Sequence, residues 1–101
     1  MSQINAATLK QRLQNGETLN LLDVREPIEF HTSNIGGINI PVAKLVTDIR
    51  HVTYNKNDEI IVICTAGIRS ENAQRILTDL GYLNILNLKG GLRALHKLNN
   101  K

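Results

Sequence analysis

The sequence predicts an α/β protein, built as a small parallel sheet with helices on both faces. Apolar runs of strand length alternate along the chain with segments whose apolar residues repeat at helical spacing. Glycine or proline stands between many of these segments, where turns are expected. Such alternation is typical of parallel sheets, which bind ligands beyond the carboxyl ends of their strands.

The first predicted elements are a helix and a strand. Asn5 can cap a helix that ends near Gly16. The apolar face of this helix comprises Ala6, Leu9 and Leu13. A mostly apolar strand runs from Leu19 to Val24, and Pro27 forbids its continuation in a sheet.

A short helix, a short strand and a longer helix are expected next. The short helix covers Ile28 to His31, and after Gly36-Gly37 the strand covers Ile38 to Ile40 and stops at Pro41. Apolar residues at i, i+3, i+4 and i+7 then predict one face of a helix. These residues are Val42, Leu45, Val46 and Ile49.

The second half of the chain repeats the alternation. The apolar run from Glu59 to Ile63 predicts a strand that delivers Cys64 to its carboxyl end. The remaining elements are a helix with the apolar face Ala73, Ile76, Leu77 and Leu80, a stop at Gly81, a strand from Leu83 to Leu88, a turn at Gly90-Gly91 and a helix from Leu92 to Leu98.

Length and composition indicate one globular domain over residues 1–101. The 101 residues suffice for a single small core, and 42% hydrophobic with 21% charged residues is typical of globular proteins. No apolar run approaches the roughly 18 residues of a membrane-spanning helix. The start of the chain lacks the basic and apolar regions of a signal peptide. We therefore expect a cytoplasmic, reducing environment, and a lone cysteine forms no internal disulfide.

The charge pattern argues against a nucleic-acid-binding protein. The net charge is only +3, and the basic residues are scattered among acidic ones. The three aromatic residues, Phe30, Tyr54 and Tyr82, are few for stacking on bases. A slightly positive field is better suited to small anions or an acidic partner protein.

The candidate active site is the segment from Cys64 to Ser70, between a strand and a helix. A glycine-containing turn and a helix N-terminus would surround the sulfur with N–H groups, which favours thiolate over thiol. Arg69 adds a permanent cation and a rigid fork of donors for an anion. The alternative is a buried cysteine that acts only as a small hydrophobe.

Other residues have two possible roles each. Asp23 and Arg25 either orient the active loop or form a structural network with Glu29. Ser70 either caps the following helix, which we favour, or donates to the sulfur. The histidines are far apart without ligand spacing, so we expect surface residues and no metal site; they are His31, His51 and His96. We expect Gly67, Gly90 and Gly91 to serve positive φ angles or close backbone approach.

Four segments give the chain a family resemblance. The sequence Cys64-x-x-Gly67-x-Arg69-Ser70 resembles the active-site loop of rhodanese-domain sulfurtransferases, and the other three resemble further signatures of that family. These three are Leu22-Asp23-Val24-Arg25-Glu26-Pro27-x-Glu29-Phe30, Asn39-Ile40-Pro41 and Leu88-Lys89-Gly90-Gly91-Leu92. The resemblance spans nearly the whole chain and implies a single-domain rhodanese-like fold.

The chain departs from this family in two places. Residues 33–38, Ser-Asn-Ile-Gly-Gly-Ile, replace the usual Gly-His-Ile-Pro-Gly-Ala, and Leu95 replaces a tryptophan. We expect both changes to be structural. Relatives that act on phosphate or arsenate place five residues between the cysteine and the arginine, whereas four stand here, Thr65 to Ile68. The shorter loop favours a single sulfur atom over a tetrahedral oxyanion.

The resemblance implies a sulfurtransferase that needs no cofactor. Cys64 would take sulfane sulfur from a small donor such as thiosulfate or a persulfide, with Arg69 at the donor's anionic end. The loop residues Thr65, Ala66, Gly67, Ile68 and Ser70 would hold the persulfide. No second cysteine exists, so the acceptor must be cyanide, an external thiol or a thiol protein. The alternative is a persulfide carrier or partner-binding module with little turnover of its own.

Overall fold

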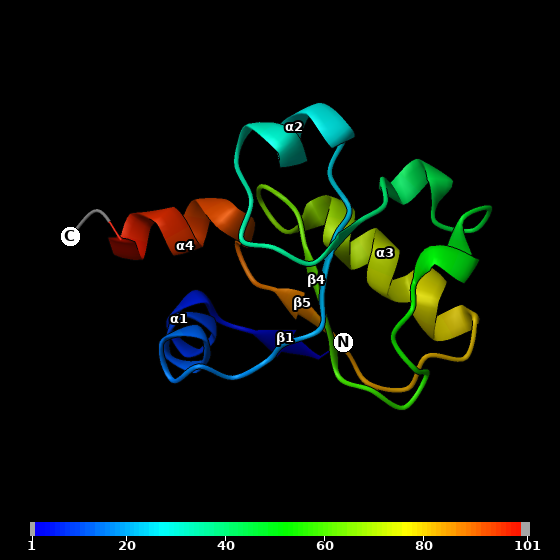
Figure 1. The fold of residues 1–101 in the computed structure, drawn as a ribbon, viewed down its shortest axis with the longest axis horizontal. Coiled ribbons are helices and arrows are strands. Elements are labelled where there is room, and N and C mark those ends of the chain that lie inside the picture. Colours follow the sequence, from blue (N-terminus) through cyan, green and yellow to red (C-terminus); the bar gives the residue numbers. More distant parts are fainter. Residues whose placement is uncertain (1, 100–101) are drawn as a thin grey trace.

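The computed structural model describes residues 2–99 and contains one parallel sheet of five strands. The strands lie in the order β1-β5-β4-β2-β3, and every neighbouring pair is parallel. Their bounds are β1 Gln3–Ile4, β2 Leu21–Asp23, β3 Ile38–Asn39, β4 Ile60–Ile63 and β5 Ile85–Leu88. The helices are α1 Ala6–Gln14, α2 Pro27–Thr32, α3 Ile68–Asp79 and α4 Gly91–Asn99, with two short 3₁₀ helices, η1 Val42–Lys44 and η2 Ile49–His51 (Figure 1).

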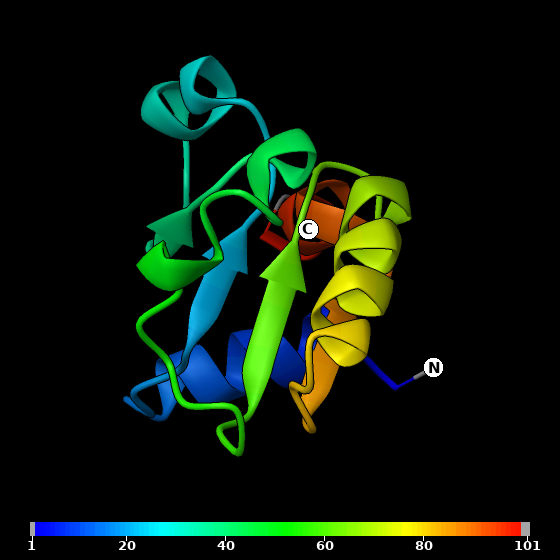
Figure 2. The ribbon, with the colours of Figure 1, turned by 90° about the vertical axis from the view of Figure 1, so that its right-hand side faces the viewer.

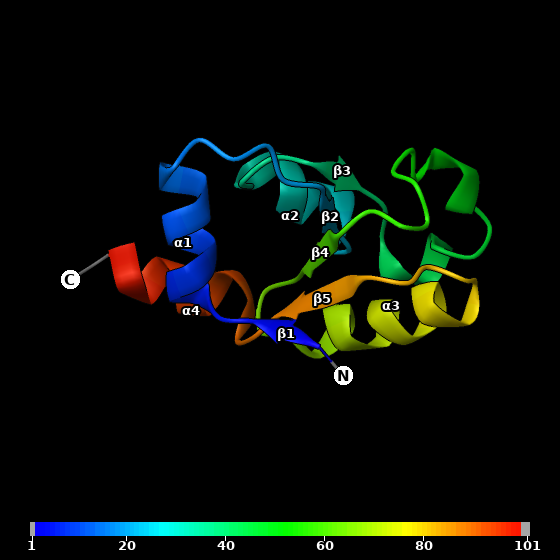
Figure 3. The same ribbon diagram turned by 90° about the horizontal axis from the view of Figure 1, so that it is seen from below.

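Helices cover both faces of the sheet, as the sequence predicts. Figure 3 shows α1 and α4 on one side and α3 on the other. The side chains of β4 alternate between these layers: Ile60 and Val62 pack in the core under α3, while Ile61 and Ile63 pack in the core under α1 and α4. Cys64 continues this alternation and belongs to the α3 core.

Several predicted elements are confirmed with shifted ends. Asn5 caps α1, where its side chain accepts a hydrogen bond from the Thr8 amide at 2.7 Å. Pro27 stands at the start of α2, and Glu26 and Glu29 form a capping box there. Leu95 is buried in the core between α1 and α4, as expected of a structural position.

The predicted helix over residues 42–49 is wrong. The segment forms η1 and η2 instead, and Val46 is 60% exposed although it belongs to the predicted apolar face. Leu45 alone of these four residues is fully buried. Valine, threonine and isoleucine are frequent in this segment, and their branched side chains disfavour a longer helix.

The carboxyl ends of β2 and β4 lie side by side and define the edge where the site forms. Asp23 is paired with Ile63 in the register of these strands. Figure 2 shows α2 beyond the tips of both strands, on the same edge as the start of α3. Among residues 2–99, no helix is long and apolar enough to cross a membrane.

Candidate functional site

Cys64 directly follows β4, and the turn after it wraps backbone N–H groups around the sulfur. The amide of Gly67 donates to Cys64 Sγ at 3.0 Å, and the amide of Ser70 donates at 3.4 Å. Gly67 caps α3 with φ of +97°, a conformation that places its N–H toward the sulfur and disfavours other residues. The cysteine is 1% exposed and contributes to the lining of a cavity of about 430 Å³.

The surroundings of the sulfur lower the pKa of Cys64 below its ordinary value. Burial alone raises the pKa, but hydrogen bonds from the Ser70 side chain and from the amides of Ser70, Gly67 and Ala66 outweigh it. The positive end of α3 points at the same atom. The thiolate, which is the nucleophilic form, is therefore favoured.

Ser70 connects the sulfur to Asn87 on β5, a buried residue that the sequence analysis missed. The Ser70 hydroxyl lies 3.3 Å from Cys64 Sγ and donates to Asn87 Oδ1. Asn87 Nδ2 in turn donates to the Gly67 carbonyl at 3.2 Å. This bond fixes which end of the Asn87 side-chain amide faces Ser70. Ser70 is therefore a contact of the sulfur, and the favoured prediction that it caps α3 is wrong because Gly67 occupies that position.

Arg69 lies beside the cavity and is paired with Glu29 from α2. Its guanidinium donates to both carboxylate oxygens, at 2.6 and 3.0 Å, and to Thr65 Oγ1 at 3.1 Å. The Arg69 hydrogen bonds lower the pKa of Glu29 to about 2, although partial burial opposes them. Arg69 thus joins α2 to the active loop, and its charge is already balanced by a carboxylate.

Asp23 and Arg25 form a separate buried pair. The Arg25 guanidinium donates to both Asp23 carboxylate oxygens, at 2.8 to 3.2 Å, and to the Ser33 carbonyl at 2.7 Å. The predicted network of this pair with Glu29 is absent among the described residues, because Glu29 binds Arg69 and Thr65 instead. The pair ties β2 to the segment after α2 and places Arg25 near Thr65 in a second cavity.

The N-terminus of α4 holds the first part of the loop. The Leu92 amide donates to the Cys64 carbonyl at 2.9 Å, and the Arg93 amide donates to the Thr65 carbonyl at 3.0 Å. Gly91 allows this approach: a β-carbon there would lie 2.4 Å from the Thr65 carbonyl oxygen, and its φ is +64°. The prediction that the double glycine serves close backbone approach is confirmed.

Arg93 is a cation of the Cys64 cavity that the sequence analysis did not identify. The cavity is lined by Glu29, Cys64, Thr65, Ala66, Ile68, Arg69 and Arg93. None of the ion pairs among residues 2–99 involves Arg93. Arg93 stands 29 residues beyond Cys64, so no sequence motif links it to the active loop. Its place in the cavity follows only from the packing of α4 against the loop.

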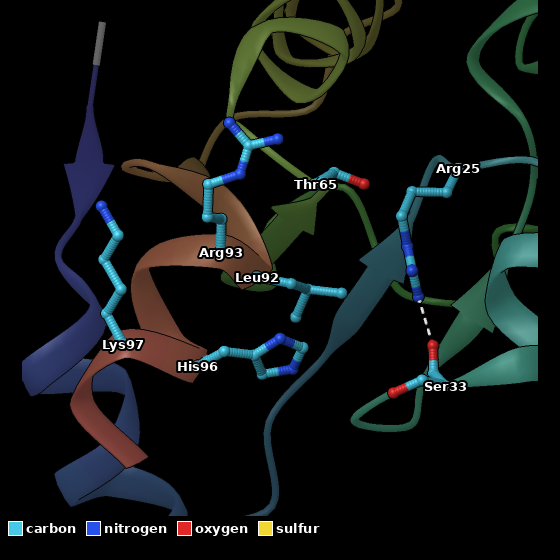
Figure 4. Close-up of a pocket in the computed structure, with 7 residues that line it drawn as sticks. All are labelled: Arg25, Ser33, Thr65, Leu92, Arg93, His96 and Lys97. Carbon is cyan, nitrogen blue, oxygen red and sulfur yellow. Dashed lines mark hydrogen bonds between the residues drawn. The ribbon is translucent and has the colours of Figure 1, made fainter. Parts of the chain in front are cut away.

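The described residues hold no group of three or more histidine, cysteine, aspartate or glutamate side chains that could ligate a metal ion. The three histidines are exposed, as predicted. One of them, His96, lines the second cavity, beside α4 (Figure 4).

Comparison with known proteins identifies the family of this chain. The profile of the rhodanese-like domain family matches residues 5–98. The chain belongs to that family. A rhodanese-related protein from Thermoplasma volcanium superposes with a TM-score of 0.81 at 33% identity, covering 97% of this chain and 93% of that one.

Two relatives of this rhodanese-like chain have names from sulfur chemistry. The thiosulfate sulfurtransferase PspE of Escherichia coli is 37% identical over 75 residues, which are 73% of this chain and 71% of PspE. The putative sulfur carrier protein YrkF of Bacillus subtilis is 37% identical over 92 residues, or 90% of this chain. This chain spans about half of YrkF, 49% of its length. Relatives of these kinds support a rhodanese of the sulfurtransferase type.

Proposed function

We propose that the protein transfers sulfane sulfur through a persulfide on Cys64. The observation that supports this most strongly is that Cys64 lines a cavity while two backbone amides donate to its sulfur. Those donors favour the thiolate, which is the form that attacks a sulfur donor. The names of the two relatives support the same chemistry.

In the first half-reaction, the Cys64 thiolate attacks the outer sulfur of a donor such as thiosulfate. A bond forms between Cys64 Sγ and that sulfur, the sulfur–sulfur bond of thiosulfate breaks, and its electron pair leaves with sulfite. Charge is conserved: the thiolate and thiosulfate carry one and two negative charges, and the persulfide and sulfite carry one and two. No oxidant, metal or cofactor is needed for this displacement.

The loop from Thr65 to Ser70 is the proposed cradle for the outer sulfur. The amides of Thr65, Ile68 and Arg69 donate to no acceptor within residues 2–99, so they are free to face an anionic sulfur. Ala66 and Ile68 add uncharged side chains to the cavity. The four-residue spacing between Cys64 and Arg69 suits one sulfur atom better than a phosphate group.

In the second half-reaction, a thiophilic acceptor such as cyanide or a thiolate attacks the outer sulfur. The persulfide bond breaks and its electron pair returns to Cys64 Sγ, which restores the thiolate. Donor and acceptor use the same cavity in turn, which predicts ping-pong kinetics. Arg69 is proposed to hold the loop through Glu29 and to bind anionic substrates with the side of its guanidinium that faces the cavity. Asp23 and Arg25 are proposed to stabilise the carboxyl end of β2, beside the loop.

A carrier role is the second candidate, and the name of YrkF favours it. In that case the persulfide would form and be passed to a partner protein, with little transfer to small acceptors. Both roles share the first half-reaction and differ only in the second.

Steady-state production of thiocyanate from thiosulfate and cyanide tests the proposal. Wild-type protein should show parallel double-reciprocal lines, and the Cys64→Ser variant should show no transfer while retaining the wild-type circular dichroism spectrum. Substantial transfer by folded Cys64→Ser would exclude Cys64 as the nucleophile. A stable persulfide in the wild type, without thiocyanate, would support the carrier.

A further inference from the structure

A second cavity opens beside the Cys64 cavity, between α4 and the end of β2. Its volume is about 360 Å³, within the range of small-molecule sites. It is lined by Arg25, Ser33, Thr65, Leu92, Arg93, His96 and Lys97. Figure 4 shows Leu92 and His96 of α4 facing Arg25 and Ser33 across this space.

The lining of this cavity is basic and has no acidic residue. Arg25, Arg93 and Lys97 are cations, but the charge of Arg25 is balanced by Asp23 at 2.8 Å. Arg93 and Lys97 take part in none of the ion pairs among residues 2–99. The cavity therefore presents two cations that no described carboxylate neutralises.

The two cavities share Thr65 and Arg93. The Arg93 amide is hydrogen-bonded to the Thr65 carbonyl, one residue after Cys64, so the shared wall is fixed to the active loop. A ligand whose sulfur reaches Cys64 can therefore extend its remaining atoms past Arg93 into the basic cavity. Arg69 is less suited to this role because Glu29 already holds its guanidinium in a bidentate pair.

We propose that this second cavity binds the carboxylate of a small thiol or persulfide whose sulfur exchanges with Cys64. The proposal rests on the proposed function and specifies its substrate class: low-molecular-weight thiols that carry a carboxylate near the sulfur. Arg93 binds that carboxylate, and Lys97, whose side chain points away from Arg25 and Ser33 in Figure 4, adds only a weaker attraction. A small ligand is favoured over an acidic protein because the cavity has the volume of a small-molecule site and shares Thr65 and Arg93 with the Cys64 cavity.

Sulfur reaches this ligand in the second half-reaction. The thiolate of the bound ligand attacks the outer sulfur of the Cys64 persulfide, a new sulfur–sulfur bond forms on the ligand, and the Cys64 thiolate leaves. A proton on the outer sulfur stays with it, and no oxidant or reductant is required. Binding of the carboxylate at Arg93 raises the rate by orienting the attacking sulfur.

N-acetylcysteine and its amide are a matched pair of probes, since they differ in one carboxylate. Protein loaded with sulfur from thiosulfate is mixed with each thiol at equal thiolate concentration, and the rate of persulfide discharge is measured. We expect wild-type protein to prefer the carboxylate by about threefold or more at low ionic strength, the scale of one partly exposed charge pair. The Arg93→Gln variant should lose most of that preference, and Lys97→Gln a smaller part.

Arg50→Gln is the control, because Arg50 is an exposed cation of η2 that lines neither cavity. It removes the same charge and should keep the wild-type preference. An equal loss in Arg50→Gln and Arg93→Gln would overturn the proposed site, since net charge alone would then explain the effect. Equal rates of wild-type protein with the two thiols would also overturn it.

A binding measurement separates failure of this site from failure of the proposed function. Folded Cys64→Ser protein, which transfers no sulfur, is titrated with N-acetylcysteine and followed by amide chemical shifts. Saturable shifts at residues 92–97 that Arg93→Gln weakens would support the site even if wild-type protein forms no persulfide. Absence of these shifts, with sulfur transfer intact in the wild type, would overturn the site alone.

Discussion

The Ser70 hydroxyl has a single hydrogen and two acceptors within reach, the Cys64 sulfur and Asn87 Oδ1. With Cys64 as a thiol, the hydroxyl donates to Asn87 and the thiol donates to Ser70. With Cys64 as a thiolate, the sulfur competes for that hydrogen. We therefore expect Asn87 to influence the ionisation of Cys64 through the Ser70 hydroxyl.

This competition predicts opposite effects of two substitutions on the pKa of Cys64. Ser70→Ala removes a donor to the thiolate, so the pKa should rise. Asn87→Leu releases the hydroxyl to the sulfur, so the pKa should fall. The pH dependence of alkylation by iodoacetamide measures both. In a Ser70→Ala background, Asn87→Leu should have no effect on the pKa; a fall there would show that Asn87 acts by another route.

The Glu29–Arg69 pair predicts a pH-dependent stability. The pKa of Glu29 is lowered to about 2 in the folded protein, so the stabilisation is present above its ordinary value of 4.5 and is lost as the pH falls toward 2. Glu29→Gln should lower the free energy of unfolding at pH 7, and the difference from wild type should shrink between pH 4.5 and 2. Urea denaturation across this range measures it; a difference that does not change with pH would contradict the pair's role.

At the residue scale, the sequence reveals the parts of the site that are close together along the chain. Cys64, Gly67 and Ser70 lie within one loop, so their spacing was informative. Glu29, Asn87 and Arg93 reach the same loop from α2, β5 and α4, and only the packing of those elements on the sheet brings them there.

At the scale of elements, the site depends on two helix N-termini that meet at one loop. α3 directs its first amides at the sulfur, and α4 directs its first amides at the carbonyls of Cys64 and Thr65. The loop is thus fixed from both sides.

Loop length can be tested by inserting one glycine after Ala66. The longer loop has five residues between cysteine and arginine and should move the Gly67 amide away from the sulfur. We expect persulfide formation to slow by at least about tenfold, the cost of losing one charge-assisted hydrogen bond. Stopped-flow measurement of sulfite release reports the rate; a rate equal to wild type would show that the loop geometry does not matter.

Close approach of α4 predicts a large cost for Gly91→Ala. The added β-carbon would meet backbone atoms of Thr65 at 2.4 Å, and the residue would keep a positive φ. We expect a loss of at least about 2 kcal/mol in the free energy of unfolding. Gly16→Ala is the control, with φ of +77° and nothing within 4 Å, and should cost only about 1 kcal/mol. Equal losses in the two variants would contradict the proposed contact.

The sequence predicts those elements best that have a clear apolar pattern and a clear end. Apolar runs such as β4, and helices with a cap and a clear apolar face such as α1, were located within a few residues. The segment 42–49 has helical spacing, but only Leu45 enters the core fully. Spacing alone does not show how long a segment stays in contact with the core.

At the scale of the whole molecule, the parallel sheet with helices on both faces follows from the alternation of strand and helix patterns. The strand β1, Gln3–Ile4, was not predicted because two residues give no pattern. Its place at the edge, paired with β5, depends on a partner more than 80 residues away. The order of strands matters for function, since it brings β4, β2 and the start of α4 to one edge.

At this edge of the sheet, Cys64 is proposed to accept sulfane sulfur as a persulfide. Intact mass spectrometry after treatment with thiosulfate and removal of the donor detects that persulfide. We expect a gain of one sulfur atom, absent in Cys64→Ser and reversed by cyanide, together with no hydrolysis of an activated aryl phosphate. Hydrolysis of that phosphate by wild-type protein, with no gain in mass after thiosulfate or a low-molecular-weight persulfide, would contradict this proposal.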